Sequence, residues 1–399
     1  MMKQLFKKLP PFAPDYSGVC SALFELGGVS VIMDASGCTG NYTGYDEPRW
    51  YEGAGRVFCS GVREMDAVMG DEERLVNKVN EYLATHNAAF IAILGSPVPM
   101  VIGTDYISLA REMEQRFGIP AFAFDTSGMF HYDKGASQAF MEIAKRFLKP
   151  SVDKIPNGIN LIGTTPLDMG SPENLETLKL VLQERGYRVV SSWSMDTSLA
   201  SVSASSSAAL NLVVSNSGLE AARFMKKALG IPFLAGLPVG QKGTEMLFQR
   251  MKSLMDGLQG GAAAYPERSN NFKALVIGEQ ISANGLRECL KLDFDFQYVN
   301  VASFFNLDKE FIEPGDRSLE CEADLTRLTE EKRYDLIIGD PLYKDLINLN
   351  TETAYLELPH IAVSSKIHWQ EKNVIIGQSG YAMISKALKK ENRFERNVS

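Results

Sequence analysis

Three of the chain's five cysteines, Cys20, Cys38 and Cys59, lie within its first 60 residues. Gaps of 18 and 21 residues separate them, so the thiols come from different loops and only the fold can bring them together. A zinc finger is excluded, because no close Cys-x-x-Cys pair is present. Since soft thiolates select iron–sulfur clusters among the common cofactors, this set of residues favours an iron–sulfur site.

The residues around Cys38 suit such a site, because Gly37 and Gly40 on either side let the backbone approach a bulky inorganic group. Three thiolates leave one iron of a cubane in need of another ligand, which an aspartate, a serine or a cysteine of a partner chain can supply. The alternative is three unrelated buried cysteines, since free cysteine is among the most buried residue types. We interpret Cys289 and Cys321 in that way, as isolated residues on charged helical stretches.

Two histidines are candidate proton donors, because imidazole titrates near neutrality. His368 precedes a glycine loop at residue 377, and His131 follows a predicted strand; for each, the alternative is a surface or hydrogen-bonded structural histidine. Glu279 and Asp340 also follow predicted strands. They are either proton donors to a substrate or residues that cap turns and helices.

The chain alternates apolar runs with amphipathic stretches, which predicts parallel sheets joined by crossover helices. The pattern predicts strands at 29–33, 90–94, 121–124, 210–214, 271–277 and 335–338. It predicts helices at 105–117, 219–229 and 285–292. A glycine followed by Ile-Pro ends the first two helices. We therefore expect an α/β protein with three Rossmann-like domains, at residues 1–150, 151–266 and 267–399. Polar, Gly- and Pro-rich segments at 149–157 and 257–271 mark the boundaries.

Ligands of open α/β sheets gather at the carboxyl ends of the strands, so the loops there are the places to search for a site. The serine tract at 201–207 is either a flexible loop or an active-site loop. The sequence has no Walker-type phosphate-binding motif and no Gly-x-Gly-x-x-Gly after a strand. Any ATP chemistry must therefore come from another polypeptide, and dinucleotide binding is disfavoured.

Composition excludes several classes of protein. The 399 residues carry a net charge of −8, which argues against a nucleic-acid-binding protein. No run of about 18 apolar residues is present, so we expect no membrane partner. The first residues lack the apolar core of a signal peptide, and we expect a cytoplasmic protein with reduced thiols.

Six motifs in chain order resemble landmarks of one known family. They are residues 18–20 (GVC), 35–38 (ASGC), 60–75 (SGVREMDAVMGDEERL), 96–105 (SPVPMVIGTD), 230–240 (GIPFLAGLPVG) and 377–381 (GQSGY). The chain resembles the component 1 type oxidoreductases of the nitrogenase superfamily, which include nitrogenase subunits, the dark-operative protochlorophyllide reductases and the reductive cyclase of coenzyme F430 synthesis.

The resemblance implies a nitrogenase component 1-like fold and an iron–sulfur cluster, [4Fe-4S] or larger, at a subunit interface. Cys20, Cys38 and Cys59 would ligate it, with Ser96 as a weaker candidate because the family's third cysteine falls there. It also implies a homodimer or a heterodimer with a related subunit, an ATP-hydrolysing iron–sulfur reductase as electron donor, and a substrate reduced between the domains.

Two departures from the family separate this chain from nitrogenase itself. The cysteine and histidine that hold the molybdenum–iron cofactor would fall at Ser215 and Ile376, so we expect the substrate not to be dinitrogen. A scaffold for metallocluster or cofactor assembly is the first alternative function. A cluster-free module that binds a small molecule is the second.

Overall fold

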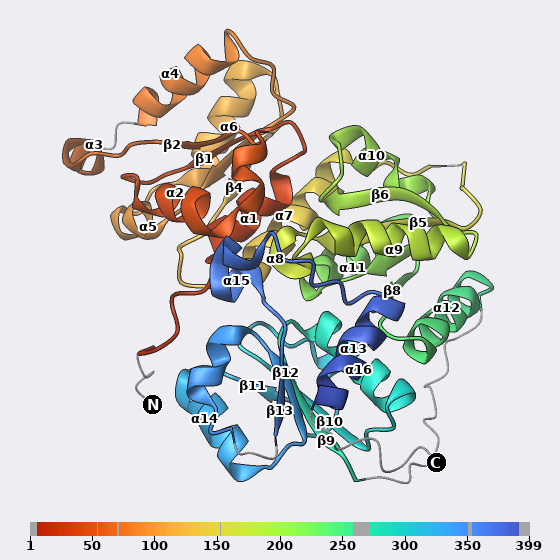
Figure 1. The fold of residues 1–399 in the computed structure, drawn as a ribbon. Coiled ribbons are helices and arrows are strands. Elements are labelled where there is room, and N and C mark those ends of the chain that lie inside the picture. Colours follow the sequence, from red (N-terminus) through yellow and green to blue (C-terminus); the bar gives the residue numbers. More distant parts are fainter. Residues whose placement is uncertain are drawn as a thin grey trace.

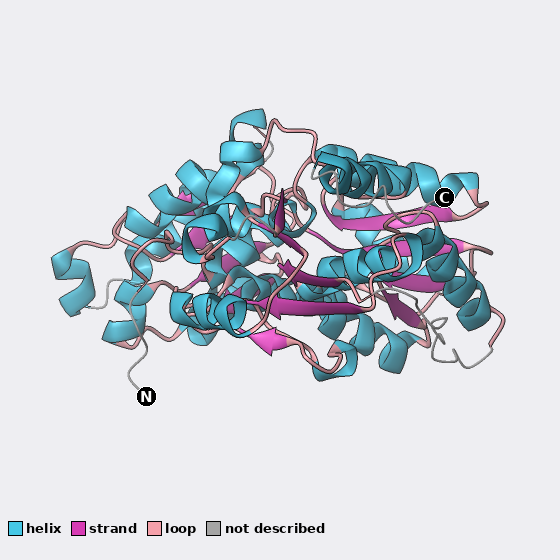
Figure 2. Cartoon of the chain, turned by 60° about the horizontal axis from the view of Figure 1, so that its bottom comes forward, coloured by secondary structure: helices cyan, strands magenta, loops and turns pink. Residues whose placement is uncertain are grey.

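The computed structural model describes residues 6–53, 55–69, 72–151, 153–257, 271–349 and 353–390. Three separate sheets succeed one another along the chain, and every strand pair within them is parallel. In Figure 1 the first sheet lies at upper left, the second at right and the third below. Helices cover the faces of the sheets (Figure 2), as crossover connections between parallel strands require.

The first sheet has the strand order β2-β1-β3-β4. Its strands are β1 (Val29–Ile32), β2 (Val57–Cys59), β3 (Ile91–Leu94) and β4 (Ala121–Phe124). All residues of β1 and β3 are buried, as expected for central strands covered on both faces. The larger helices of this part are α1 (Asp15–Leu23), α4 (Glu72–Leu83), α6 (Tyr106–Phe117) and α7 (Tyr132–Phe147).

The second and third sheets repeat this plan. The second has the order β6-β5-β7-β8, with β5 (Gly158–Thr164), β6 (Arg188–Ser194), β7 (Leu210–Val213) and β8 (Phe233–Ala235), and its larger helices are α9 (Pro172–Glu184), α11 (Leu219–Leu229) and α12 (Lys242–Met255). The third sheet has the strand order β11-β10-β9-β12-β13. Its strands are β9 (Lys273–Ile277), β10 (Tyr298–Ser303), β11 (Arg317–Ser318), β12 (Leu336–Gly339) and β13 (Ala354–Glu357). The larger helices of this part are α13 (Gln280–Asp293), α14 (Glu322–Glu331) and α16 (Gln378–Lys390). The predicted fold class is confirmed.

The domain limits at residues 150 and 266 remain predictions, although each expected domain contains one sheet. Residues 258–270 of the second expected boundary lie outside the described residues. None of the described helices is both long enough and apolar enough to cross a bilayer.

Most predicted elements agree with the structure to within one or two residues, but two differ. Helix α13 begins at Gln280 rather than at residue 285, because the Glu279 carboxylate accepts hydrogen bonds from the backbone N–H groups of Ile281 and Ser282. The serine tract is not a flexible loop: it forms α10 (Leu199–Ser203) and a 3₁₀ turn, where the buried Ser205 hydroxyl bonds with Ser191 and Trp193.

The segment after β13 joins all three parts of the molecule. The N–H of Ala13 donates to the carbonyl of Ala362 at 2.9 Å, and α15 (Ile361–Ser364) packs against α8 (Pro166–Met169). Figure 1 shows α15 beside α8, above the third sheet. Gly377 then pairs with Val239 in an isolated parallel bridge. The three sheets therefore surround a common junction.

Helices α1 and α7 cross so closely that glycine is needed on both. A Cβ at Gly18 would lie 1.9 Å from the Tyr132 carbonyl oxygen, and a Cβ at Gly135 would lie 1.8 Å from the Asp15 carbonyl oxygen. The atoms in the way belong to the backbone of a packed helix, so they cannot move aside as the end of a flexible side chain can. The glycine before Cys20 in the first motif thus has a packing function.

We predict that Gly135→Ala lowers the free energy of unfolding by about 1–3 kcal/mol or more, because the added methyl group forces these helices apart. Urea denaturation measures the change. Gly44→Ala is the matched control, since nothing lies within 4 Å of a Cβ there. Equal losses of stability in the two variants would show that the helix crossing does not require glycine.

Candidate functional site

Polar and sulfur side chains gather at the carboxyl edge of the first sheet. Strands β2, β1 and β3 are parallel neighbours, so their carboxyl ends lie side by side. Cys59 is the last residue of β2, Asp34 follows β1 by two residues and Ser96 follows β3 by two residues. The short helix α2 (Gly37–Asn41) adds Cys38 to the same edge.

Hydrogen bonds connect these residues. The Cys59 thiol donates to the Asp34 carbonyl oxygen at 3.2 Å and accepts from the Gly61 N–H at 3.3 Å. The Ser96 hydroxyl donates to the Met33 carbonyl oxygen at 2.7 Å. Oδ2 of the Asp34 carboxylate accepts a hydrogen bond from the Thr39 N–H at 3.0 Å. This bond holds the turn that carries Cys38.

Two opposing effects act on the Cys38 thiol. Burial and the nearby Asp34 carboxylate raise the pKa of Cys38, and interactions with the side chains of Tyr16 and Ser96 offset this rise only in part. Cys59, Ser96 and the turn that carries Cys38 are all hydrogen-bonded to the two residues after β1, Met33 and Asp34. The structure therefore brings together two of the predicted cluster ligands, with Cys59 on the adjacent strand.

The edge leaves room for a large group. Cys38 and Cys59 are both partly exposed, and Gly37 and Gly40 have no atom within 4 Å of where a side chain would begin. Two sulfurs and a hydroxyl next to open space fit part of the ligand set of an iron–sulfur cluster.

Cys20 lies behind this edge. It follows Tyr16 by one helical turn on α1, it has no exposed surface, and burial together with the Glu47 charge raises the pKa of its thiol. Among the described residues, no group of three or more His, Cys, Asp or Glu side chains is arranged to hold a metal ion.

The remaining two cysteines lie on or next to helices of the third part of the chain, far from this edge in the fold. Cys289 is buried on α13, and Cys321 is partly exposed just before α14.

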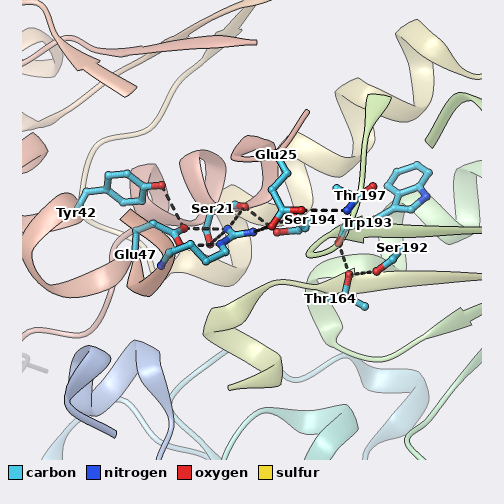
Figure 3. A network of polar contacts seen from close by, with 10 residues as sticks. Ser21, Glu25, Tyr42, Glu47, Thr164, Ser192, Trp193, Ser194 and Thr197 are labelled. Carbon is cyan, nitrogen blue, oxygen red and sulfur yellow. Dashed lines mark hydrogen bonds and ion pairs between the residues drawn. The ribbon is translucent and has the colours of Figure 1, made fainter. Parts of the chain in front are cut away.

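A buried ion cluster fixes the segments that carry the candidate ligands. The Arg49 guanidinium forms two hydrogen bonds with the Glu47 carboxylate, at 2.8 and 2.9 Å, and one with Glu25 at 2.9 Å. It also donates at 2.9 Å to the carbonyl oxygens of Ser21 on α1 and Ser194 on β6. Figure 3 shows these acceptors converging from the first and second sheets.

A second candidate site is a cavity of about 60 Å³ at the three-sheet junction. Its polar lining comes from the ends of several strands: Asp168 and Asn174 after β5, Glu279 after β9, His360 after β13, and His368 beyond α15. The volume is enough for a few water molecules or a small ligand.

Two carboxylates, the buried Glu279 and the partly buried Asp168, face this cavity without a cation. Asp168 accepts from the hydroxyls of Tyr132, Thr165 and Ser217. Glu279, which is 2% exposed, accepts only from backbone N–H groups. Burial is the largest cause that raises the pKa of each carboxyl group, and for Glu279 the Asp168 charge raises it further.

The predicted histidines lie at two different pockets. His368 lines the cavity at the three-sheet junction, and its Nδ1 lies 2.7 Å from the Glu371 carboxylate. His131 lines an open pocket of about 440 Å³ between α7, α11 and the loop at Asn306, and its ring packs on Phe305. Whether either donates a proton stays a prediction.

His360 was missed by the sequence analysis, although it follows a strand in the same way as Glu279. Its ring stacks on Phe305, and burial lowers its pKa to about 4, so the imidazole is neutral at physiological pH. Asp340, in contrast, caps a 3₁₀ turn through the N–H of Leu342 and does not line the cavity.

Comparisons with known proteins agree with the fold. The sequence profile of the family "Nitrogenase component 1 type Oxidoreductase" matches residues 14–302. The solved structures "Nitrogenase Cp1 at pH 5" and "Nitrogenase Cp1 at pH 6.5" superpose with TM-scores of 0.68 and 0.70, at 17% and 14% identity. The matches cover 99% and 100% of this chain and 90% and 96% of those chains.

Three curated relatives illustrate the range of roles among similar proteins. The nitrogenase molybdenum-iron protein alpha chain of Methanosarcina barkeri and the nitrogenase iron-molybdenum cofactor biosynthesis protein NifE of Bradyrhizobium diazoefficiens are each 29% identical over 206 residues. Each of these alignments spans 50% of this chain and only 37% of the relative. The alpha chain of Clostridium pasteurianum is 23% identical over 330 residues, which are 73% of this chain and 59% of that protein.

We predict that a thiol reagent modifies Cys38, Cys59 and Cys321 in the native, metal-free protein, and that Cys20 and Cys289 react only after denaturation. The first three are partly exposed, whereas the other two have no exposed surface that a reagent could reach in the folded chain. Mass spectrometry of the labelled peptides identifies each site. Rapid labelling of Cys20 in the folded chain would contradict the burial described above.

Proposed function

Because the chain belongs to the nitrogenase component 1 type oxidoreductase family, we propose that it is an iron–sulfur reductase subunit. It receives electrons from a separate ATP-hydrolysing iron–sulfur protein and passes them to a substrate held between its domains. The observation that carries the proposal is the meeting of Cys38, Cys59 and Ser96 at one open edge of the first sheet.

Cys38 and Cys59 would hold the cluster, together with Cys20 on the inner side, and Ser96 lies close enough to Cys38 to be a further oxygen ligand. When bound, an iron–sulfur cluster supplies one-electron transfer. Asp34 and Tyr16 orient the Cys38 segment, and the Arg49 cluster fixes α1 beneath it.

A second chain would complete the ligand set. The face next to Cys38 is apolar and exposed: Val98, Met100, Val101 and Ile102 of α5 (Pro97–Ile102) are 39%, 46%, 79% and 43% exposed. Exposed apolar surface of this kind marks a protein–protein interface. It supports a homodimer or a heterodimer in which the partner contributes the missing ligands.

The cavity at the junction is the proposed site of substrate reduction. The positions that would hold a molybdenum–iron cofactor are occupied by residues with other roles. Ser215 is fully buried and donates to the Gly163 carbonyl oxygen at 2.9 Å, and Ile376 is 1% exposed within the core. These contacts support a substrate other than dinitrogen.

Assembly of a metallocluster for another protein is the second candidate function. The observation in its favour is the similarity to NifE proteins of several organisms, which are named as cofactor biosynthesis proteins. A scaffold would use the same cysteine edge, but it would give up its cluster rather than turn over a substrate.

We predict that the protein purified without oxygen contains iron and sulfide, with roughly four irons per cluster. Cys38→Ala should lose most of this iron, because it removes the thiolate at the centre of the site. Cys321→Ala is the matched control, since this thiol is also partly exposed but lies in the third part of the chain. Iron and sulfide analysis provides the measurement, and equal iron in both variants would refute the site.

Incubation of the iron-loaded protein with an apo acceptor protein separates the two candidate functions. A reductase retains its iron and accepts electrons from the ATP-dependent donor, whereas a scaffold transfers its iron to the acceptor.

A further inference from the structure

The cavity at the junction contains an acid pair whose function the electron-transfer proposal does not explain. Asp168 and Glu279 come from different sheets, and both line the cavity. No Lys or Arg is among the described residues that line it. Two carboxylates that lie near each other in such a cavity without a cation are costly to ionise together, because each charge repels the other and neither is well hydrated.

The hydrogen bonds of the two residues differ in kind. Glu279 accepts from three backbone N–H groups, those of Asn216 at 2.8 Å, Ile281 at 3.0 Å and Ser282 at 2.9 Å, which favour its carboxylate form. Asp168 accepts hydrogen bonds from three hydroxyls. A backbone N–H can only donate, whereas a hydroxyl can rotate, accept a hydrogen bond from a protonated carboxyl group and donate its own hydrogen elsewhere. Asp168 therefore has the partners that can take up and pass on a proton.

A chain of hydrogen-bonding groups connects Asp168 with His360, which also lines the cavity. The Tyr132 hydroxyl contacts Asp168 Oδ1 at 2.5 Å and lies 3.5 Å from Nε2 of His360. The other ring nitrogen of His360, Nδ1, is buried and has no hydrogen-bond partner in the described structure, while the residue lines the cavity. A buried imidazole nitrogen without a partner is expected to meet a ligand or a water molecule there.

We propose that Asp168 and Glu279 together hold one exchangeable proton, and that Tyr132 and His360 deliver it to a substrate in the cavity. This inference rests on the proposed reductase function, which consumes protons along with electrons. It assigns the proton-donating group at the cavity to His360, a residue outside the sequence-based candidates.

The transfer balances in protons without any further reactant. In the loaded state the Asp168 carboxyl group donates to the Tyr132 oxygen, Tyr132 donates to Nε2 of His360, and Nδ1 carries a hydrogen. The Nδ1 proton moves to the substrate, the Tyr132 proton moves to Nε2, and the Asp168 proton moves to the Tyr132 oxygen. A proton taken up from water at Nδ1 then reverses the same shifts, which restores the Asp168 carboxyl group, the Tyr132 hydroxyl and the hydrogen on Nδ1. No electron leaves the protein side chains.

Other titratable groups face the pair from each neighbouring element. Tyr132 and Asp133 belong to α7, His360 precedes α15, and His368 and Glu371 lie beyond it. Tyr132 and His360 do not compete for the stored proton: burial raises the pKa of Tyr132 well above its usual value and lowers that of His360 to about 4. Both are neutral at physiological pH, so they can relay a proton but do not store one.

Infrared spectroscopy of the full chain across a pH titration tests the stored proton. The background is the Asp46→Asn variant, because burial raises the pKa of Asp46 to about 7 at another place in the fold. In that background a protonated-carboxyl band should persist to neutral pH, and either Asp168→Asn or Glu279→Gln should abolish it. An unchanged band at neutral pH in both variants would overturn the proposal.

Nitrogen-15 NMR of the four histidines tests the delivery step, with His360→Gln for assignment. His360 should be neutral at neutral pH with its hydrogen on Nδ1, and Tyr132→Phe should abolish that preference. An imidazolium, or a hydrogen on Nε2, would overturn the relay. Neither measurement needs iron or substrate, so a protein that holds the proton but binds no iron would refute the proposed function and leave the acid pair intact.

Discussion

The buried guanidinium of Arg49 is the contact on which the arrangement of the cysteine edge depends. It is 5% exposed and is shared by two carboxylates and by carbonyl oxygens from the first and second sheets. Removing one member of such a group typically costs about 3–5 kcal/mol, because an uncompensated charge is left in the interior. The helix that carries Cys20 and the segment that follows Cys38 are therefore held together, and both are anchored to the strand that ends at Ser194.

Much of this fold follows from local patterns, because parallel strands that are buried on both faces read as short apolar runs. The loops at the carboxyl ends of those strands were expected to hold a ligand site, and Glu279 was identified there with its two possible roles. The structure shows that it caps α13 and also lines the cavity. Spacing alone could not show that Cys38 lies next to Ser96 while Cys20 is buried, since that depends on how α1 packs through Gly18. His360 was not identified as a candidate from the sequence, because the strand before it was not predicted.

The two candidate sites have complementary chemistry. The outer edge offers sulfur ligands beside open space and an apolar surface, which suits an electron carrier shared with a second chain. The inner cavity offers carboxyl, hydroxyl and imidazole groups that pass protons but bind soft metals poorly. Both lie at the carboxyl ends of parallel strands, where the fold leaves backbone and side chains free to bind a ligand. A reduction that consumes electrons and protons needs both kinds of site.

The most direct test of this account is anomalous X-ray scattering at the iron absorption edge from crystals of the protein grown without oxygen. The account predicts a strong iron peak beside the sulfurs of Cys38 and Cys59, at the open edge of the first sheet. Iron located only in the cavity between the sheets, or no iron within bonding distance of either sulfur, would contradict it.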